Sequence, residues 1–206
     1  MSRSKSSSTW LQEHHADMYV KRAQVEGYRS RAVYKLAQLD EKDKLFRHGM
    51  TVIDLGAAPG GWSQWLKLRF GDQVRVFALD ILDMEPLSGV NFIQGDFREQ
   101  SVLDALLVQL GDHKADLVMS DMSPNITGIK AVDQPSTMLL AELARDLALQ
   151  VLAKNGHFLA KIFQGEGFDA FVKDLRQHFK QVVIRKPDAS RARSPEIYVL
   201  AKCYTA

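Results

Sequence analysis

The stretch that organises this chain is Asp54-Leu55-Gly56-Ala57-Ala58-Pro59-Gly60-Gly61-Trp62, which we interpret as a buried strand passing through a glycine-rich turn into a helix. Gly56, Gly60 and Gly61 lack a Cβ atom, so their backbone can adopt positive φ and lie flat against a bound molecule. A tight strand-to-helix turn that binds nothing is the alternative interpretation, because a glycine pattern is weak evidence when it stands alone. The acids that follow along the chain favour a binding site.

Two of these acids restrict the class of ligand. The glycine stretch lacks the Gly-Lys-Ser/Thr ending of a P-loop and does not fit the G-x-G-x-x-G fingerprint, which disfavours triphosphates and a nicotinamide oxidoreductase. Asp80 closes the apolar run 74–79, where an acid can accept hydrogen bonds from both ribose hydroxyls. Asp96 lies just past the run 91–94 and can accept from an adenine amine. These positions predict a nucleoside-type ligand without a pyrophosphate.

Strand-like and helical patterns alternate along most of the chain. Strands are predicted at residues 51–55, 74–79, 91–94, 115–120, 156–162, 181–185 and 197–202. Helices are predicted at 10–25, 30–42, 62–70, 99–110, 134–153 and 167–179. The last two strands are joined without a helical pattern, so we expect them to pair antiparallel. The fold class is therefore α/β and Rossmann-like, with a seven-stranded, mostly parallel sheet, an antiparallel last strand and helices on both faces.

Composition is typical of a single enzyme-sized domain. The chain has 206 residues, 46% of them hydrophobic, which is enough to bury a full core. We divide it into a basic leader with a helical extension, 1–28, and one domain, 29–206. A single cysteine, Cys203, excludes a disulfide framework and a multi-cysteine metal site, so no metal is expected. Without a signal-peptide or membrane-spanning pattern, we expect a cytoplasmic protein that contacts no membrane, and a monomer.

Positive charge is concentrated in two places. Residues 1–35 hold seven Lys or Arg against three acids, a balance of +4 within a total of +2. A second cluster occupies 185–194, in a connection that contains proline and serine. Two basic patches indicate a polyanionic partner such as RNA, although a solvated surface is the alternative. The residues predicted to contact RNA are Arg29, Arg31, Lys35, Arg191 and Arg193.

Two charged residues stand out near the ends of central strands. Asp121 follows the apolar run 115–120 and is expected to lie over the ligand crevice. Lys161 lies within the otherwise apolar run 157–163, where an amine must be paired or neutral. A lysine on an edge strand that reaches water is the alternative. The neighbouring acid favours a functional pair.

In these residues the chain resembles the FtsJ/RrmJ-type 2′-O-ribose methyltransferases, and specifically those bacterial members that act on large-subunit (23S) ribosomal RNA. The likeness covers nearly the whole chain and rests on five motifs in order. These are Asp54–Ser63, Gln94–Phe97, Ser120–Asn125, Lys161–Glu166 and Arg185–Ser194, with Glu196 following. Departures are small: Ser123 stands where alanine is expected, and Pro195 restricts the backbone before Glu196.

The resemblance implies an S-adenosylmethionine-dependent enzyme with a Rossmann-like methyltransferase fold. The implied catalytic tetrad is Lys35, Asp121, Lys161 and Glu196. The implied S-adenosylmethionine contacts are Gly60, Trp62, Asp80, Asp96 and Asp121. The implied substrate is the 2′-hydroxyl of a uridine in ribosomal RNA, in the A-loop of the assembled large ribosomal subunit.

The expected chemistry needs a base, because a ribose hydroxyl must lose its proton as it attacks the methyl group. Lys161 can accept that proton only as a neutral amine, which burial and a second ammonium at Lys35 favour and Asp121 opposes. We expect Asp121 to orient the lysine, and Glu196 to hold the ribose or Lys35. A transfer-RNA 2′-O-methyltransferase and a non-catalytic RNA-binding factor of ribosome assembly are the alternatives.

Overall fold

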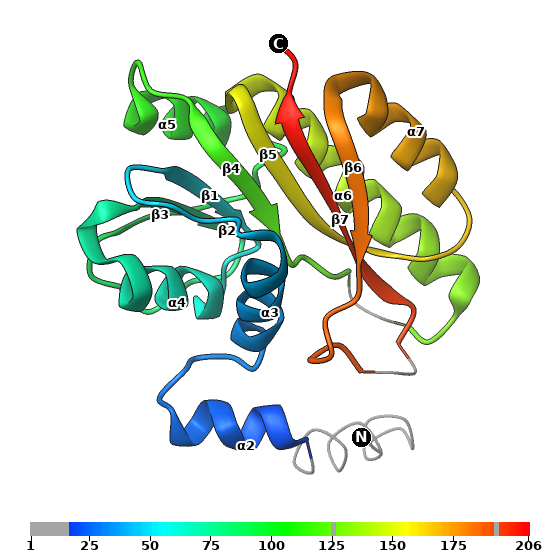
Figure 1. Cartoon of the computed structure of the whole chain (residues 1–206), viewed down its shortest axis with the longest axis horizontal. Helices are drawn as coiled ribbons and strands as arrows, with labels where there is room; N and C mark the ends of the chain where they lie inside the picture. The colour runs from blue at the N-terminus through cyan, green and yellow to red at the C-terminus, as the bar shows by residue number, and fades with distance from the viewer. Residues whose placement is uncertain (1–16, 125–126, 192–193) are drawn as a thin grey trace.

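The computed structural model describes residues 17–124, 127–191 and 194–206, apart from the side chain of residue 130. Its centre is a seven-stranded sheet with the strand order β3-β2-β1-β4-β5-β7-β6 (Figure 1). The strands are β1 (Thr51–Leu55), β2 (Arg75–Asp80), β3 (Val90–Gln94), β4 (Ala115–Ser120), β5 (Leu152–Phe163), β6 (Phe179–Arg185) and β7 (Glu196–Tyr204). Strands β1 to β5 pair in parallel, whereas β7 runs antiparallel to both of its neighbours, β5 and β6. The predicted fold class is confirmed.

Helices cover both faces of the sheet. They are α2 (Met18–Val25), α3 (Val33–Asp43), α4 (Gly61–Phe70), α5 (Gln100–Leu110), α6 (Lys130–Val151) and α7 (Phe168–His178), with a 3₁₀ turn η1 (Gly71–Gln73). Alternate strand residues face opposite sides of the sheet. Ile53 therefore packs in the cluster that contains residues of α5, α6 and α7. Its neighbour Val52 packs in the cluster that contains residues of α3 and α4. Helix α2, within the predicted leader, adds Ala23 to that second cluster.

The central strands form where the sequence has continuous apolar runs. All five residues of β1 are buried, as expected of a parallel strand covered by helices on both faces. Two predicted helices have different boundaries. The helix expected over 10–25 begins at Met18, after the extended N-cap Asp17, and residues 10–16 of that prediction lie outside the described residues. The helix expected over 134–153 begins at Lys130 and ends at Val151, and β5 starts at Leu152. The start of β5 pairs with β4 at Ala115, and a register irregularity follows. That extra pairing extends the strand back to the end of the helix.

The topology places the ends of β1 and β4 together. Strand β1 pairs with β2 on one side and with β4 on the other, so the direction of the strand order reverses between β1 and β4. In open α/β sheets, ligands bind at such a switch point, beyond the carboxyl ends of the strands. The loops that follow Leu55 and Ser120 meet there. No helix of the described ranges is long and apolar enough to cross a membrane.

Candidate active site

The glycine loop after β1 is held in place by the neighbouring strand. The amides of Gly56 and Ala57 donate to the Leu79 carbonyl at 2.8 and 3.1 Å. Gly56 and Gly60 have φ of 72° and 101°, in the region that favours glycine. A Cβ at Gly60 would lie 2.9 Å from the sulfur of Met84, which shows that the protein itself also packs against this loop. The glycines are thus required for close packing as well as for any ligand.

A pocket lies against this loop, and we call it the donor pocket. It is lined by Ser30, Ala32, Asp54, Gly56, Ala57, Ala58, Pro59, Gly61, Trp62 and Asp121. Two carboxyl groups and no lysine or arginine belong to this lining. The donor pocket therefore suits a ligand with a cationic centre and disfavours a phosphate.

Asp54 is the buried acid of the donor pocket. Its side chain accepts a hydrogen bond of 2.7 Å from the Ser63 hydroxyl. Burial raises the pKa of Asp54 to about 7, with a further rise from the charges of Asp121 and Asp80, although the Ser63 hydrogen bond opposes the shift. A strand-end acid can be recognised from sequence, but its complete burial cannot. The assignment of site residues from sequence therefore missed Asp54.

Asp80 and Asp96 lie at neighbouring strand ends, as expected, but both carboxylates have partners within the protein. Asp80 accepts from the amides of Ala58 and Leu82, each at 2.8 Å. Asp96 pairs with Arg98, whose hydrogen bonds lower the pKa of Asp96. Neither acid belongs to the lining of the donor pocket. Their predicted contacts with a nucleoside stay predictions.

Ser30 and Ala32 form one wall of the donor pocket, and their neighbour Arg29 contacts the loops around it. The indole nitrogen of Trp62 donates to the Ala32 carbonyl at 2.8 Å, which ties the start of α4 to the start of α3. Arg29 donates to the carbonyls of Pro59, Glu85 and Pro86 at 3.2, 2.5 and 3.0 Å. We predicted Arg29 as an RNA contact, but here its guanidinium binds the loops around the donor pocket. The physical reason is that three converging carbonyls satisfy the planar donor fork.

Sheet register brings the tetrad residues to one place. Ser120 pairs with Ala160, so the next residues along these parallel strands, Asp121 and Lys161, come level. Lys161 pairs with Tyr198 across the antiparallel strands, and paired residues share a face of the sheet. Glu196, two residues before Tyr198, lies on that same face.

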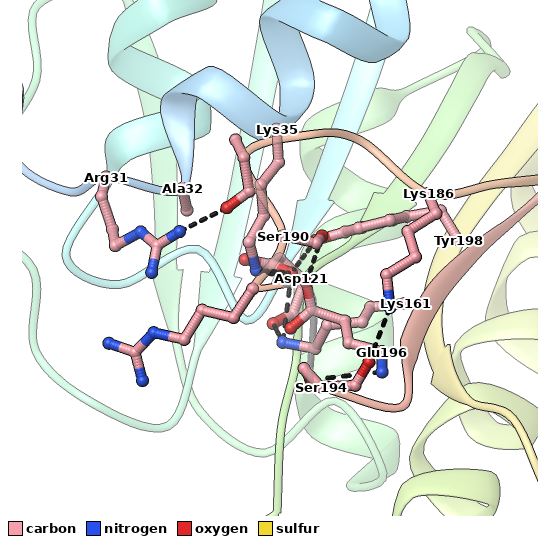
Figure 2. Close-up of polar contacts among 12 residues, drawn as sticks. Arg31, Ala32, Lys35, Asp121, Lys161, Lys186, Ser190, Ser194, Glu196 and Tyr198 are labelled. Atoms are coloured by element: carbon pink, nitrogen blue, oxygen red, sulfur yellow. Dashed lines mark hydrogen bonds and ion pairs between the residues drawn. The ribbon is translucent and has the colours of Figure 1, made fainter. Parts of the chain in front are cut away.

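Figure 2 shows the tetrad side chains converging between α3 and the ends of the central strands. Lys161 Nζ lies 2.6 Å from the backbone oxygen of Asp121 and 3.1 Å from its Oδ1. Lys35 Nζ, on the first turn of α3, lies 2.8 Å from Glu196 Oε1 and 3.7 Å from Asp121 Oδ1. The tetrad thus contains two amines and two carboxylates, and Pro195 does not prevent Glu196 from reaching Lys35.

Electrostatics keep Asp121 ionised. Burial alone raises the pKa of Asp121, but Lys161, Lys35 and the hydroxyl of Tyr198 more than compensate, and the net shift is downward. The Tyr198 hydroxyl donates to Asp121 Oδ1 at 2.6 Å. Burial and the two nearby acids hold the pKa of Tyr198 well above its usual value, so the phenol stays protonated.

Two further residues support the tetrad and were not found from sequence. Tyr198 lies on β7 and was interpreted only as part of a strand. Ser190, in the loop between β6 and β7, donates from its hydroxyl to Glu196 Oε1 at 2.8 Å. Their positions depend on strand register and loop conformation. The motif Arg185–Ser194 contains Ser190, but the resemblance assigned a role neither to this residue nor to Tyr198.

The other predicted RNA contacts differ in their surroundings. Lys35 is 9% exposed and belongs to the tetrad. Arg31 and Arg191 lie at the edge of the site, and both contact Asp17. Arg193 lies outside the described residues. Across the described parts of the chain, no three acids, histidines or cysteines gather in a way that could hold a metal ion.

The chain is similar to known methyltransferases over nearly its whole length. Residues 28–204 match the family described as FtsJ-like methyltransferase. The protein named Ribosomal RNA large subunit methyltransferase E in Hydrogenovibrio crunogenus is 60% identical over 202 residues, covering 98% of each chain. The protein of the same name in Hahella chejuensis is also 60% identical, with the same coverage.

Solved structures share the fold. A crystal structure described as a ribosomal RNA methyltransferase from Plasmodium falciparum superposes with a TM-score of 0.80 at 28% identity. The match covers 87% of this chain and all of that one. Human methyltransferase-like protein 13, solved in complex with SAH, matches at a TM-score of 0.57 and 16% identity, covering 84% of this chain and 80% of that one. The second likeness concerns the fold alone.

Proposed function

The chain belongs to the FtsJ-like methyltransferase family, and on that premise we propose that it methylates the 2′-hydroxyl of a uridine ribose in large-subunit ribosomal RNA. The methyl donor is S-adenosylmethionine. The observation that supports the proposal best is the convergence of Lys35, Asp121, Lys161 and Glu196 directly beside an acid-lined pocket. Asp121 belongs to both, so the donor and the acceptor would meet at this residue.

The donor pocket fits S-adenosylmethionine in charge. When bound, this cofactor supplies a methyl group activated by a sulfonium centre. Asp121, which stays ionised, provides the negative charge that a cationic ligand requires, and Asp54 adds to it only above its raised pKa of about 7. Trp62 lines the donor pocket, and Gly60 is the residue that precedes helix α4 in the adjoining glycine loop. Asp80 and Asp96 stay the candidates for its ribose and adenine.

Lys161 is proposed as the base that takes the proton of the 2′-hydroxyl. A neutral amine has two N–H donors and one lone pair. The backbone oxygen and Oδ1 of Asp121 lie where they can accept both N–H groups, which would leave the lone pair for the hydroxyl proton. Lys35, held by Glu196, supplies positive charge beside the developing alkoxide. Asp121 positions both amines.

The proposed partner is the assembled large ribosomal subunit, with the protein acting as a monomer in the cytoplasm. The test is transfer of labelled methyl from S-adenosylmethionine to free ribosomal RNA, to transfer RNA and to isolated large subunits, followed by mapping of the modified nucleotide. Label on a uridine ribose of the large subunit is expected. Label on a base, or on transfer RNA alone, would contradict the proposal.

A Lys161→Ala variant tests the base. It should lose turnover yet bind S-adenosylmethionine in calorimetry as the unaltered protein does. Lys161→Arg is a stricter control, because arginine keeps the positive charge but stays protonated. Near-normal turnover of Lys161→Ala would refute the assignment. A non-catalytic assembly factor with an inactive pocket would show no heat of cofactor binding.

A further inference from the structure

Two arginines at the edge of the tetrad share one carboxylate oxygen. Oδ2 of Asp17 contacts Nη1 of Arg31 and lies 3.6 Å from Nε of Arg191. The side chains of Asp17 and Arg31 are only 10% and 15% exposed. Asp17 precedes α2, whereas Arg191 belongs to the loop between β6 and β7. A single acid from the start of the described chain thus holds together two distant basic segments.

This arrangement lies next to the reacting groups. Arg31 also donates to the carbonyl of Ala189. The following residue, Ser190, donates to Glu196, which in turn holds Lys35. Figure 2 shows Arg31 beside Ala32, at the left of the site, with Lys35 and Ser190 nearer its centre. Because a phosphate flanks every ribose of RNA, a ribose held at the tetrad brings a phosphate close to it.

The chemistry of the two arginines suits a phosphate. The guanidinium fork matches the oxygens of a phosphate as well as those of a carboxylate. Nε of Arg31 is buried, and the described residues provide no acceptor for it. A buried donor left unpaired is costly, so this arginine is incompletely satisfied by Asp17. A phosphodiester offers more acceptor positions than the single oxygen that Asp17 provides here.

We propose that the Asp17 carboxylate occupies the place of a substrate phosphate between Arg31 and Arg191, and that RNA binding exchanges this carboxylate for a backbone phosphodiester. The inference rests on the proposed function, since it assigns a phosphate site to the same RNA substrate. Asp17 then acts as an internal competitor. It lowers affinity for RNA until the substrate delivers a phosphate to the arginine pair.

The test replaces Asp17 without disturbing helix α2. The Asp17 side chain accepts from the Tyr19 amide at 2.9 Å as the N-cap of α2. Asparagine caps helices as well as aspartate does, so Asp17→Asn removes the charge and keeps the cap. Glu26→Gln is the matched control: it removes one acid from the end of the same helix, where Glu26 pairs with Arg22 instead.

Binding is measured with a fluorescent single-stranded oligouridylate and with unmodified large ribosomal subunits. Asp17→Asn should bind both about three- to tenfold more tightly, as expected when a competing ion pair is removed. Glu26→Gln should not. Adding Arg191→Ala to Asp17→Asn should remove much of the gain, because Arg191 is one of the two arginines that the loss of the Asp17 charge frees.

Unchanged or weaker RNA binding by Asp17→Asn, with normal thermal unfolding, would overturn the phosphate site. An Asp17→Ser variant, which also caps the helix, repeats the test if the asparagine variant fails to fold. Failure of the proposed function would be seen separately, as absence of methyl transfer by the unaltered protein. Tighter RNA binding without methyl transfer would support the phosphate site and contradict the enzyme.

Discussion

Replacing Asp54 by asparagine should remove a specific pH dependence from folding. Burial raises the pKa of Asp54 to about 7, whereas an unfolded aspartate titrates near about 3.9. Between these values the folded protein keeps a proton that the unfolded chain releases. The fold is therefore stabilised below pH about 7, and this stabilisation is lost as the pH rises through that value. Asp54→Asn keeps the shape and still accepts from Ser63, but it cannot titrate.

The magnitude follows from the size of the shift. A pH of about 5.5 lies about 1.5 units below the folded-state pKa of Asp54. At about 1.36 kcal/mol per unit, the retained proton then stabilises the fold by about 2 kcal/mol relative to high pH. At about pH 8.5 the contribution is near zero. Urea unfolding of the cofactor-free protein at both pH values measures the difference, and comparison with Asp54→Asn cancels the other titrating groups.

Between about pH 5.5 and about pH 8.5, the free energy of unfolding should fall by about 2 kcal/mol more in the unaltered protein than in Asp54→Asn. Asp72→Asn serves as the control, because this side chain is 99% exposed and lies far from the donor pocket. It should follow the unaltered protein. Parallel behaviour of the unaltered protein and Asp54→Asn would refute the argument that burial keeps Asp54 protonated.

Three other substitutions test the site and its scaffold. Tyr198→Phe removes the hydrogen bond to the tetrad carboxylate and should lower turnover about tenfold or more while sparing cofactor affinity in calorimetry; normal turnover would contradict a positioning role. Arg29→Ala removes three contacts to carbonyls around the donor pocket and should weaken S-adenosylmethionine binding about tenfold without loss of RNA affinity. Arg69→Ala is its exposed control, and the reverse pattern would favour the predicted contact of Arg29 with RNA. Asp43→Ala leaves Arg185 on β6 and Lys202 on β7 without their shared carboxylate, and it should lower the free energy of unfolding by about 3 kcal/mol in urea titration. An unchanged value would show that these ion pairs add nothing to stability.

Sequence reasoning predicts the sheet well because its signals are local. Continuous apolar runs ending in an acid or a glycine identify β1, β2 and β4, and a connection without a helix predicts the antiparallel end. Residues 152–153 show the limit. They are Leu and Ala, which both favour helix, yet Leu152 pairs with Ala115 of β4 and this tertiary pairing makes the segment strand. Family membership, enzyme class and fold class are confirmed, whereas the roles of the individual site residues stay predictions.

The site is less accessible to such reasoning. The tetrad residues lie far apart in sequence: residue types alone suggested the pair of Asp121 and Lys161, and only the resemblance to a known family added Lys35 and Glu196. Arg29 illustrates what sequence cannot supply, because a basic residue in a basic segment is expected to face solvent or RNA. Three carbonyls from two loops, Pro59 in one and Glu85 and Pro86 in the other, accept from its guanidinium here. Tyr198 likewise reaches Asp121 through strand register, which the residue types of β7 do not reveal.

The reversed direction of β7 has a consequence for how the protein matures. Glu196 and Tyr198 enter the site from the first residues of β7, which lies between β5 and β6, two strands that precede it in the chain. A growing polypeptide that ends at Arg185 contains every residue that lines the donor pocket but lacks the clamp on Lys35 and the phenol on Asp121. The side chains that surround the donor pocket are thus encoded ahead of the last strand, whereas two groups that position the reacting amines and carboxylate arrive with it.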